Sequence, residues 1–135
     1  MKSLDTNVLA RFFIDDDDDL QSLKQRPAAI EAMADRAFVS VTVLLEFEWV
    51  MRGFYEIPRK AISKIFRAIL GIEHLTVEDR AHVIAAIEMF DANFDFADAM
   101  HVARSGQASC FVTFDKKLAK RTSTLGLNVP IELLD

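Results

Sequence analysis

Short hydrophobic runs in this chain alternate with longer segments whose polar and apolar positions repeat at helical spacing. Residues 37–40 form a short apolar run that predicts a strand, and residues 110–114 form a continuous β-prone run that predicts a buried strand. Residues 1–4 and 129–134 are two further predicted strands. Pro130 in the last of them indicates a position at a sheet edge.

The segments between these runs predict helices. Residues 42–52 are apolar on nearly every side, which predicts a buried helix. In residues 61–70 the apolar positions share one face, with Pro58 ahead of the helix and Gly71 at its end. The other predicted helices cover residues 8–14, 28–37 with Pro27 at the first helical position, 76–93 with an N-cap at Thr76, 96–105, and 116–122 before a break at Gly126.

Strands that alternate with helices, and that lack a polar face, predict a parallel sheet covered on both sides. We therefore predict an α/β fold, a three-layer α/β/α sandwich with a short, mostly parallel sheet of four or five strands. The length of 135 residues fits one domain covering residues 1–135. A hydrophobic content of 51% argues against a disordered chain.

Charge and cysteine content narrow the function classes. Sixteen basic residues face twenty-one acidic ones, which gives a net charge of −5 and counts against a protein that holds nucleic acid by bulk positive charge. A single cysteine, Cys110, excludes an intramolecular disulfide and a cysteine-cluster zinc site. Residues 1–5 lack the apolar run of a signal peptide, and residues 41–51 are too short to span a bilayer. We expect a cytoplasmic protein without a membrane partner.

Four acidic residues lie where predicted strands end or where helices begin. Asp5 and Asp115 each follow a strand directly, Glu46 lies one turn into a helix, and Asp98 lies in the first turn of another. Ligands of open parallel sheets bind beyond the carboxyl ends of the strands, so these side chains are expected to converge. Glu46 and Asp98 are flanked by apolar residues with no Lys or Arg to pair with them, whereas Glu48 is expected to be solvated.

Carboxylates that converge without a cationic partner repel one another. Two unit charges about 4 Å apart cost roughly 4 kcal/mol at an effective dielectric constant of 20. A hard divalent cation such as Mg²⁺ or Mn²⁺ resolves this repulsion, because it prefers oxygen ligands and is commonly completed by substrate phosphate. The placement of the acids therefore indicates metal-assisted phosphodiester chemistry.

The same residues carry a resemblance to a known family. The segment LDTNVL at residues 4–9 resembles the opening motif of PIN-domain ribonucleases, and VLLEFEWV at 43–50 resembles their second acidic block. FADAMH at 96–101 and FVTFDKKLA at 111–119 are similar to the third and fourth blocks. Each block alone is a weak signal, but all four occur in order over nearly the whole chain. The size of the chain is most similar to that of VapC-type toxins of bacterial toxin–antitoxin pairs.

This resemblance implies an activity, a cofactor and partners. Asp5, Glu46, Asp98 and Asp115 would bind Mg²⁺ or Mn²⁺ and form the catalytic centre of an endoribonuclease. The family resemblance further implies a homodimer, possible higher toxin–antitoxin assemblies, and a cognate antitoxin that places a basic side chain in the acidic site.

Other polar residues near these acids are candidates for supporting roles. Asn7 and Thr113 could orient carboxylates or waters, or could be turn residues, and Asp95 could be an additional ligand or orienting group. Four basic residues directly after Asp115 could contact RNA phosphates or could form an ordinary solvated helix face: Lys116, Lys117, Lys120 and Arg121.

Two alternatives to a nuclease remain open from the sequence. A receiver-like phosphoacceptor domain also uses acids at strand ends with Mg²⁺, but it needs an acid pair after the first strand, where this chain has Asp5, Thr6 and Asn7. A PIN-like binding module without catalysis is the second alternative, against which the presence of all four acids argues. The aspartate run at residues 15–19 lacks the glycine and the final glutamate of an EF-hand loop, so it is expected to be a solvated loop.

Overall fold

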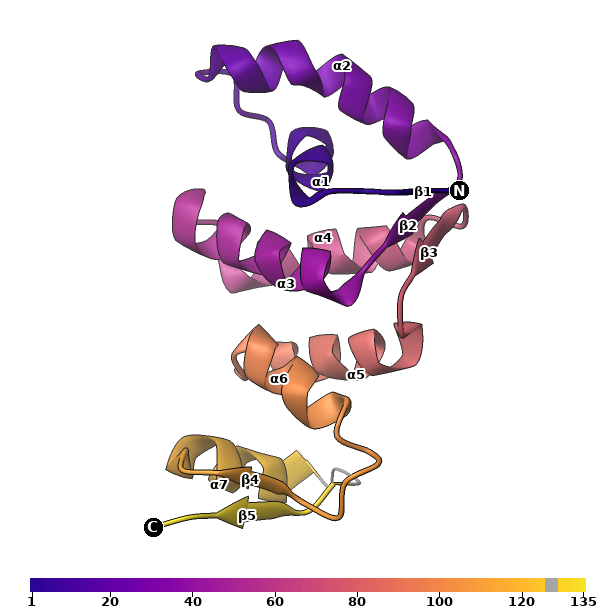
Figure 1. Cartoon of the computed structure of the whole chain (residues 1–135). Coiled ribbons are helices and arrows are strands. Elements are labelled where there is room, and N and C mark those ends of the chain that lie inside the picture. Colours follow the sequence, from indigo (N-terminus) through magenta and orange to yellow (C-terminus); the bar gives the residue numbers. More distant parts are fainter. Residues whose placement is uncertain (126–128) are drawn as a thin grey trace. The chain divides into compact units, whose positions relative to one another are not determined.

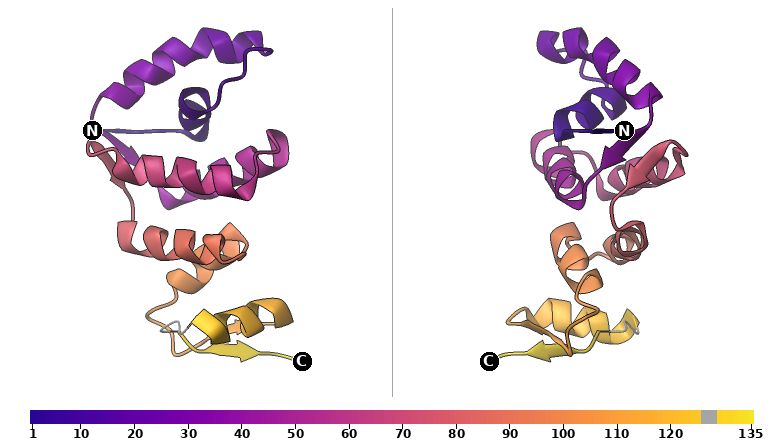
Figure 2. Two further views of the ribbon diagram at one scale, coloured as in Figure 1. Left: turned by 180° about the vertical axis from the view of Figure 1, so that it is seen from behind. Right: turned by 45° about the vertical axis from the view of Figure 1, so that its right-hand side comes forward.

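The computed structural model describes residues 1–125 and 129–135, which Figures 1 and 2 trace from the N-terminus in indigo to the C-terminus in yellow. The chain divides into two compact units, residues 1–80 and 81–135. The elements of the first unit are β1 (Lys2–Ser3), α1 (Thr6–Phe13), α2 (Leu20–Ala34), β2 (Ala37–Val39), α3 (Val41–Trp49), the π-helix η1 (Val50–Phe54), α4 (Arg59–Gly71) and β3 (Leu75–Val77). The second unit holds α5 (Arg80–Asp91, whose first residue belongs to the first unit), α6 (Phe96–Ala103), β4 (Phe111–Thr113), α7 (Lys116–Leu125) and β5 (Ile131–Leu133).

The strands of the first unit form a parallel sheet in the order β1-β2-β3. Lys2 pairs with Ala37, and Ala37 pairs in turn with Leu75. Parallel neighbours require a crossover connection, which α1 and α2 provide between β1 and β2, and α3 and α4 between β2 and β3. The carboxyl ends of β1 and β2 therefore lie at one edge of the sheet, and α1 and α3 begin there.

The helices of the first unit pack around this sheet, and α1 contacts both α2 and α3. The rings of Phe13 on α1 and Phe47 on α3 have centroids 6.3 Å apart. Phe47 is fully buried, as are Leu9 on α1 and Phe66 on α4. Burying one side chain of this size stabilises the fold by about 1.5–3 kcal/mol relative to leaving it exposed. This packing therefore holds α1 against α3.

The second unit contains a two-stranded parallel sheet, in which Phe111 of β4 pairs with Ile131 of β5. Helix α7 connects the two strands and packs against β5. Phe90 of α5 and Phe96 of α6 meet edge to face, with ring centroids 5.9 Å apart and planes at 86°. This aromatic pair joins α5 to the helix that carries Asp98.

The predicted α/β class with short parallel strands is confirmed, and the five described strands form one sheet in each unit. That residues 1–135 form a single domain stays a prediction. Among the described residues, no helix is long and apolar enough to cross a membrane. The predicted helix break at Gly126 lies outside the described residues, and the predicted strand 129–134 is found at Ile131–Leu133.

The prediction that a helix begins at residue 76 is wrong, because Leu75–Val77 form β3. Thr76 and Val77 extend the sheet by pairing with Phe38 and Val39. The backbone N–H of Val41 donates to Glu78 Oε1 at 2.9 Å, so Glu78 binds the first turn of α3, whose N-cap is Ser40. A strand of three residues is too short to leave a periodic signal in the sequence.

The predicted start of the second helix at Pro27 is also wrong, because α2 begins at Leu20 and contains Pro27. Asp19 is its N-cap, and its Oδ2 accepts hydrogen bonds from the Ser22 backbone N–H at 3.2 Å and from the Ser22 hydroxyl at 2.6 Å. These bonds lower the pKa of Asp19. The aspartate run is therefore a loop that ends in a helix cap, and its first member, Asp15, pairs with Arg26.

The strand at residues 110–114 is not buried on both faces as predicted. Val112 is 48% exposed and Phe114 is 69% exposed in the structure. A continuous apolar run reflects β propensity, and this propensity does not decide which faces of a strand become covered.

Candidate active site

Asp5 lies at the junction between β1 and α1, where the first strand of the sheet ends. It is the N-cap of α1, and its Oδ1 accepts a hydrogen bond of 2.8 Å from the backbone N–H of Thr6. The side chain remains exposed. Its carboxylate is therefore fixed by the helix start and is still accessible from solvent.

Thr6 connects Asp5 to Glu46. The Thr6 hydroxyl donates a hydrogen bond to Oε1 of Glu46, which lies on α3 forty residues later. Thr6 is only 3% exposed, so its hydroxyl is held in a packed environment. Because Asp5 and Thr6 are consecutive, this bond brings two of the four predicted acids together in the first unit.

The burial expected for the two glutamates of α3 is reversed in the structure. Glu46 is exposed on the same helical face as Thr42 and Trp49, at positions i, i+4 and i+7. Glu48 is 3% exposed, and its carboxylate accepts hydrogen bonds from Arg52 Nε at 2.9 Å and Nη2 at 3.4 Å. The prediction of a solvated Glu48 is wrong, because Arg52 one turn later compensates its charge.

This reversal changes the reason for assigning Glu46 to the site. The argument that a buried carboxylate needs a cation to offset its desolvation does not apply to Glu46, because its side chain is exposed. The support for Glu46 is instead its hydrogen bond to Thr6, beside Asp5.

Asp98 and Asp115 lie in the second unit, and each is located in or just before the first turn of a helix. Asp95 is the N-cap of α6, and its Oδ2 accepts from the backbone N–H of Asp98 at 3.1 Å. Asp115 precedes α7 and accepts from the backbone N–H of Leu118 at 3.0 Å. Thr113 accepts from the backbone N–H of Asp115 at 3.0 Å and so holds the turn after β4.

The electrostatics of this second group are unfavourable for a charged Asp98. Partial burial raises the pKa of Asp98, and the nearby charges of Asp95 and Asp115 raise it further, whereas His101 opposes the rise. Both neighbouring carboxylates therefore disfavour the charged form of Asp98. Asp95 has a clear local role as a helix cap, and the structure gives it no bond to a neighbouring carboxylate.

The four predicted acids form no ion pair with a Lys or Arg anywhere in residues 1–125 and 129–135. Within that part of the chain, no three His, Cys, Asp or Glu side chains are gathered closely enough to hold a metal ion. Each unit instead supplies one pair, Asp5 with Glu46 and Asp98 with Asp115. Both pairs consist of oxygen ligands with uncompensated charge, a donor set that fits Mg²⁺ or Mn²⁺.

Thr6 was not among the residues predicted to support the site, and a supporting role for Asn7 stays a prediction. Asn7 is exposed and lines a cavity between α1 and α2. Thr6 is buried directly after the N-cap of α1, and the sequence around it carries no signal that separates it from Asn7. Its hydroxyl then requires a partner, and Glu46 accepts from it.

Helix α7 begins with basic residues directly after Asp115. Lys116, Lys117, Lys120 and Arg121 are all exposed, and Arg121 also donates a hydrogen bond to the carbonyl oxygen of Asn93. The helix contains no acidic residue. In a chain with a net charge of −5, this is a local basic surface beside one of the predicted site acids.

Comparisons with known proteins identify the family of the chain. A family model described as "PIN domain" matches residues 3–123. The chain is 26% identical over 90 residues to a VapC ribonuclease of Aquifex aeolicus (strain VF5), which covers 67% of each protein. The matched segment of the family model contains all four predicted acids, and a receiver-like domain finds no support in either match. The chain therefore belongs to the PIN domain family.

Proposed function

We propose that the protein is a metal-dependent endoribonuclease that hydrolyses RNA phosphodiester bonds. The observation that carries this proposal is the presence of two carboxylate pairs that have no Lys or Arg partner in the described part of the chain. Family membership supports it, and so does the similarity to a VapC ribonuclease. Asp5, Glu46, Asp98 and Asp115 are proposed to hold Mg²⁺ or Mn²⁺ together and to form the catalytic centre.

The residues of the chain have distinct tasks in this proposal. The bound metal supplies Lewis acidity at the phosphate and lowers the pKa of a water. Thr6 holds the Glu46 carboxylate beside Asp5, and Asp95 fixes the helix start that positions Asp98. Thr113 fixes the turn that positions Asp115. Placing these oxygens before substrate arrives lowers the cost of reorganising them during the reaction.

The basic start of α7 is proposed to bind the RNA backbone. Lys116, Lys117 and Lys120 are exposed and project from the helix that follows Asp115. Contacts to phosphate oxygens position RNA without reading its sequence. Replacing the three lysines with glutamine should weaken binding of all RNAs alike and reduce its salt dependence, which fluorescence anisotropy at several salt concentrations would measure.

We also propose that the protein is the toxin of a toxin–antitoxin pair and forms a homodimer. The similarity to a VapC ribonuclease supports this assignment. Uncompensated carboxylates are a natural target for a basic side chain of an antitoxin, because such a contact would neutralise the site and block it. Growth arrest on expression, and rescue by the product of a neighbouring small gene, would test the assignment.

Cleavage of a panel of defined RNAs tests the central activity. The purified protein should cut RNA with Mg²⁺ or Mn²⁺, and EDTA should abolish cleavage. Asp98→Asn should remove the activity, whereas Asp17→Asn, the same substitution at an exposed residue of the aspartate run, should leave it unchanged. Wild-type cleavage by Asp98→Asn would show that the site is assigned to the wrong residues.

A further inference from the structure

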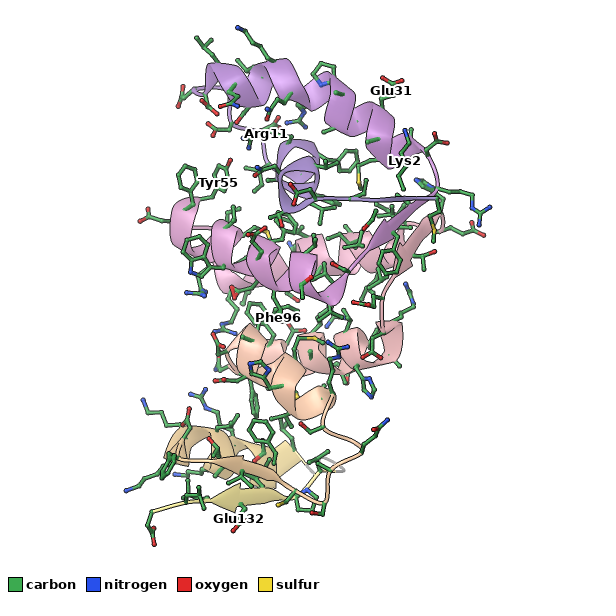
Figure 3. The ribbon with its side chains drawn as sticks, in the orientation of Figure 1. Lys2, Arg11, Glu31, Tyr55, Phe96 and Glu132 are labelled. Atoms are coloured by element: carbon green, nitrogen blue, oxygen red, sulfur yellow. The ribbon has the colours of Figure 1, made fainter. Side chains whose placement is uncertain are left out.

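A cavity lies between α2 and α1, the helix that Asp5 caps, and it has no task in the proposed chemistry. Its volume is about 250 Å³, enough for several water molecules. Its apolar side is formed by Val8, Ala28 and Ala29. Its polar side is formed by Asn7, Arg11 and Gln25. Arg11 is labelled in Figure 3, where it extends from α1.

The polar side of this cavity offers hydrogen-bond donors in particular. Arg11 donates through Nε to Oε1 of Gln25 at 2.9 Å and through Nη1 to the Tyr55 hydroxyl at 3.2 Å. An arginine has five N–H groups, so most of its donors remain for a ligand. The bond from Arg11 uses the acceptor oxygen of Gln25 and leaves its NH₂ group as a donor. No Asp or Glu lines this cavity.

The residues that line the cavity from α1 follow Asp5 directly in the chain. Asn7 is the second residue after Asp5, and Arg11 lies one helical turn further on the same face. Four residues of α-helix rise by about 6 Å. A nucleic-acid strand with one phosphate at Asp5 would therefore bring a neighbouring nucleotide to this wall.

The apolar residues of the cavity distinguish between the ligands that its donors could bind. Val8, Ala28 and Ala29 would contact the flat face of a base, whereas a phosphate group gains nothing from them. Recognition of single-stranded RNA commonly places an unstacked base in such a pocket and reads its edge by hydrogen bonds. A donor-rich wall selects a base edge that carries two adjacent acceptors.

We propose that this cavity receives the base of a nucleotide next to the cleaved bond, and that Arg11 selects guanine through its O6 and N7 acceptors. Arginine recognises this pair of acceptors with two parallel hydrogen bonds. The inference rests on the proposed ribonuclease function and adds a determinant of where RNA is cut. Tyr55 and Gln25 are positioning residues that hold the Arg11 guanidinium in the plane required.

Base analogues in one short RNA give the sharpest test. The substrate contains a single guanine beside the cleaved bond, and this guanine is replaced by inosine, which keeps O6 and N7, or by 7-deazaguanine, which lacks N7. We expect inosine to be cut as efficiently as guanine, and 7-deazaguanine to lower kcat/KM about tenfold. Equal cleavage of all three substrates would overturn the proposal.

Variants connect this preference to the cavity. Arg11→Lys keeps the charge but loses the paired donors, so it should lower cleavage of the guanine RNA to about the level of the 7-deazaguanine RNA and abolish the preference between them. Gln25→Ala should reduce the preference in the same direction. Arg36→Lys is the matched control, because Arg36 is an exposed arginine outside this cavity. Its preference should equal that of the wild type, and thermal unfolding would confirm that each variant is folded.

Other outcomes would assign the cavity to another ligand. An equal loss of cleavage for every substrate in Arg11→Lys would indicate a phosphate contact and overturn base selection. Unchanged cleavage combined with weaker inhibition by an antitoxin would make the cavity a protein-docking site and overturn the proposal as well. If the wild type cuts no RNA, guanine-dependent binding of the same oligonucleotides by fluorescence anisotropy still tests the cavity separately from the proposed activity.

Discussion

Asp5 and Glu46 in the first unit are joined through the Thr6 hydroxyl, whereas Asp98 and Asp115 in the second unit interact through charge. The first pair is thus positioned by a hydrogen bond before any ligand arrives. In the second pair, burial and neighbouring carboxylates make the charged form of Asp98 unfavourable. A divalent cation would relieve that repulsion, so the second pair should respond more strongly than the first to metal.

Removing the charge of Asp98 should produce the largest effect and should separate activity from stability. We expect Asp98→Asn to lower the rate of RNA cleavage a hundredfold or more, about 2.7 kcal/mol in the activation barrier. The same substitution should raise the melting temperature of the metal-free protein, because it removes a repelled charge. Cleavage assays and thermal unfolding in EDTA would measure both effects, with Asp17→Asn as the control. A fall in melting temperature would contradict the account.

The two glutamates of α3 allow a second comparison within one helix. Arg52→Ala leaves the buried carboxylate of Glu48 without its cation and should destabilise the fold by about 2 kcal/mol. Glu46→Gln should impair cleavage with little change in stability, because Glu46 is exposed. Urea unfolding and cleavage assays on both variants would measure this contrast. Equal destabilisation by the two substitutions would contradict the assignment of structural and functional glutamates.

Loss of the Thr6 hydroxyl should have a smaller effect, which would be seen mainly in the first pair. We expect Thr6→Val to destabilise the protein by about 1 kcal/mol and to weaken metal affinity or activity about tenfold. Thr6→Ser retains the donor and should restore most of the loss. Metal titrations of the two variants would check this. If Thr6→Ser behaved like Thr6→Val, the lost methyl group and its packing would explain the effect better than the hydrogen bond.

The pH dependence of stability should show the smallest effect. The pKa of Asp98 is raised in the folded protein, so its favourable contribution is complete below the ordinary value of 3.8. That contribution is lost as the pH rises through the folded pKa, because the unfolded chain releases this proton more readily. The difference in stability between Asp98→Asn and the wild type, measured in EDTA, should therefore grow as pH rises from below 3.8 toward neutrality. A difference that stayed constant would contradict the raised pKa.

Sequence patterns predicted the alternation of strands and helices, and they placed three of the acids at helix starts or in first turns and Glu46 one turn into α3. They failed where a tertiary contact decided the outcome. Thr76 begins no helix because residues 75–77 pair with β2 as β3, and α2 begins early because Asp19 caps it. The structure exposes Glu46 and buries Glu48, the reverse of the prediction. Helical spacing places the two glutamates on different faces of α3, but only the packing of the helix decides which face is covered.

The candidate site shows the same limit. The acids could be named from their positions and from the family motifs, but Thr6 could not be identified without its contact to Glu46. Asn7 carries the more polar side chain of the two, yet it faces the cavity between α1 and α2. Consecutive residues of a helix point in different directions, so Thr6 faces Glu46 while Asn7 faces the cavity. The amino-acid composition does not reveal which of the two directions leads to the site.

Metal binding by variants from both pairs tests the central claim most directly. Calorimetric titration with Mn²⁺ would compare the wild type with Asp5→Asn and Asp115→Asn, one substitution in each unit. If the four acids hold metal together, the wild type binds Mn²⁺ and each substitution weakens binding tenfold or more. Unchanged binding in either variant, or no binding by the wild type, would contradict a shared metal site.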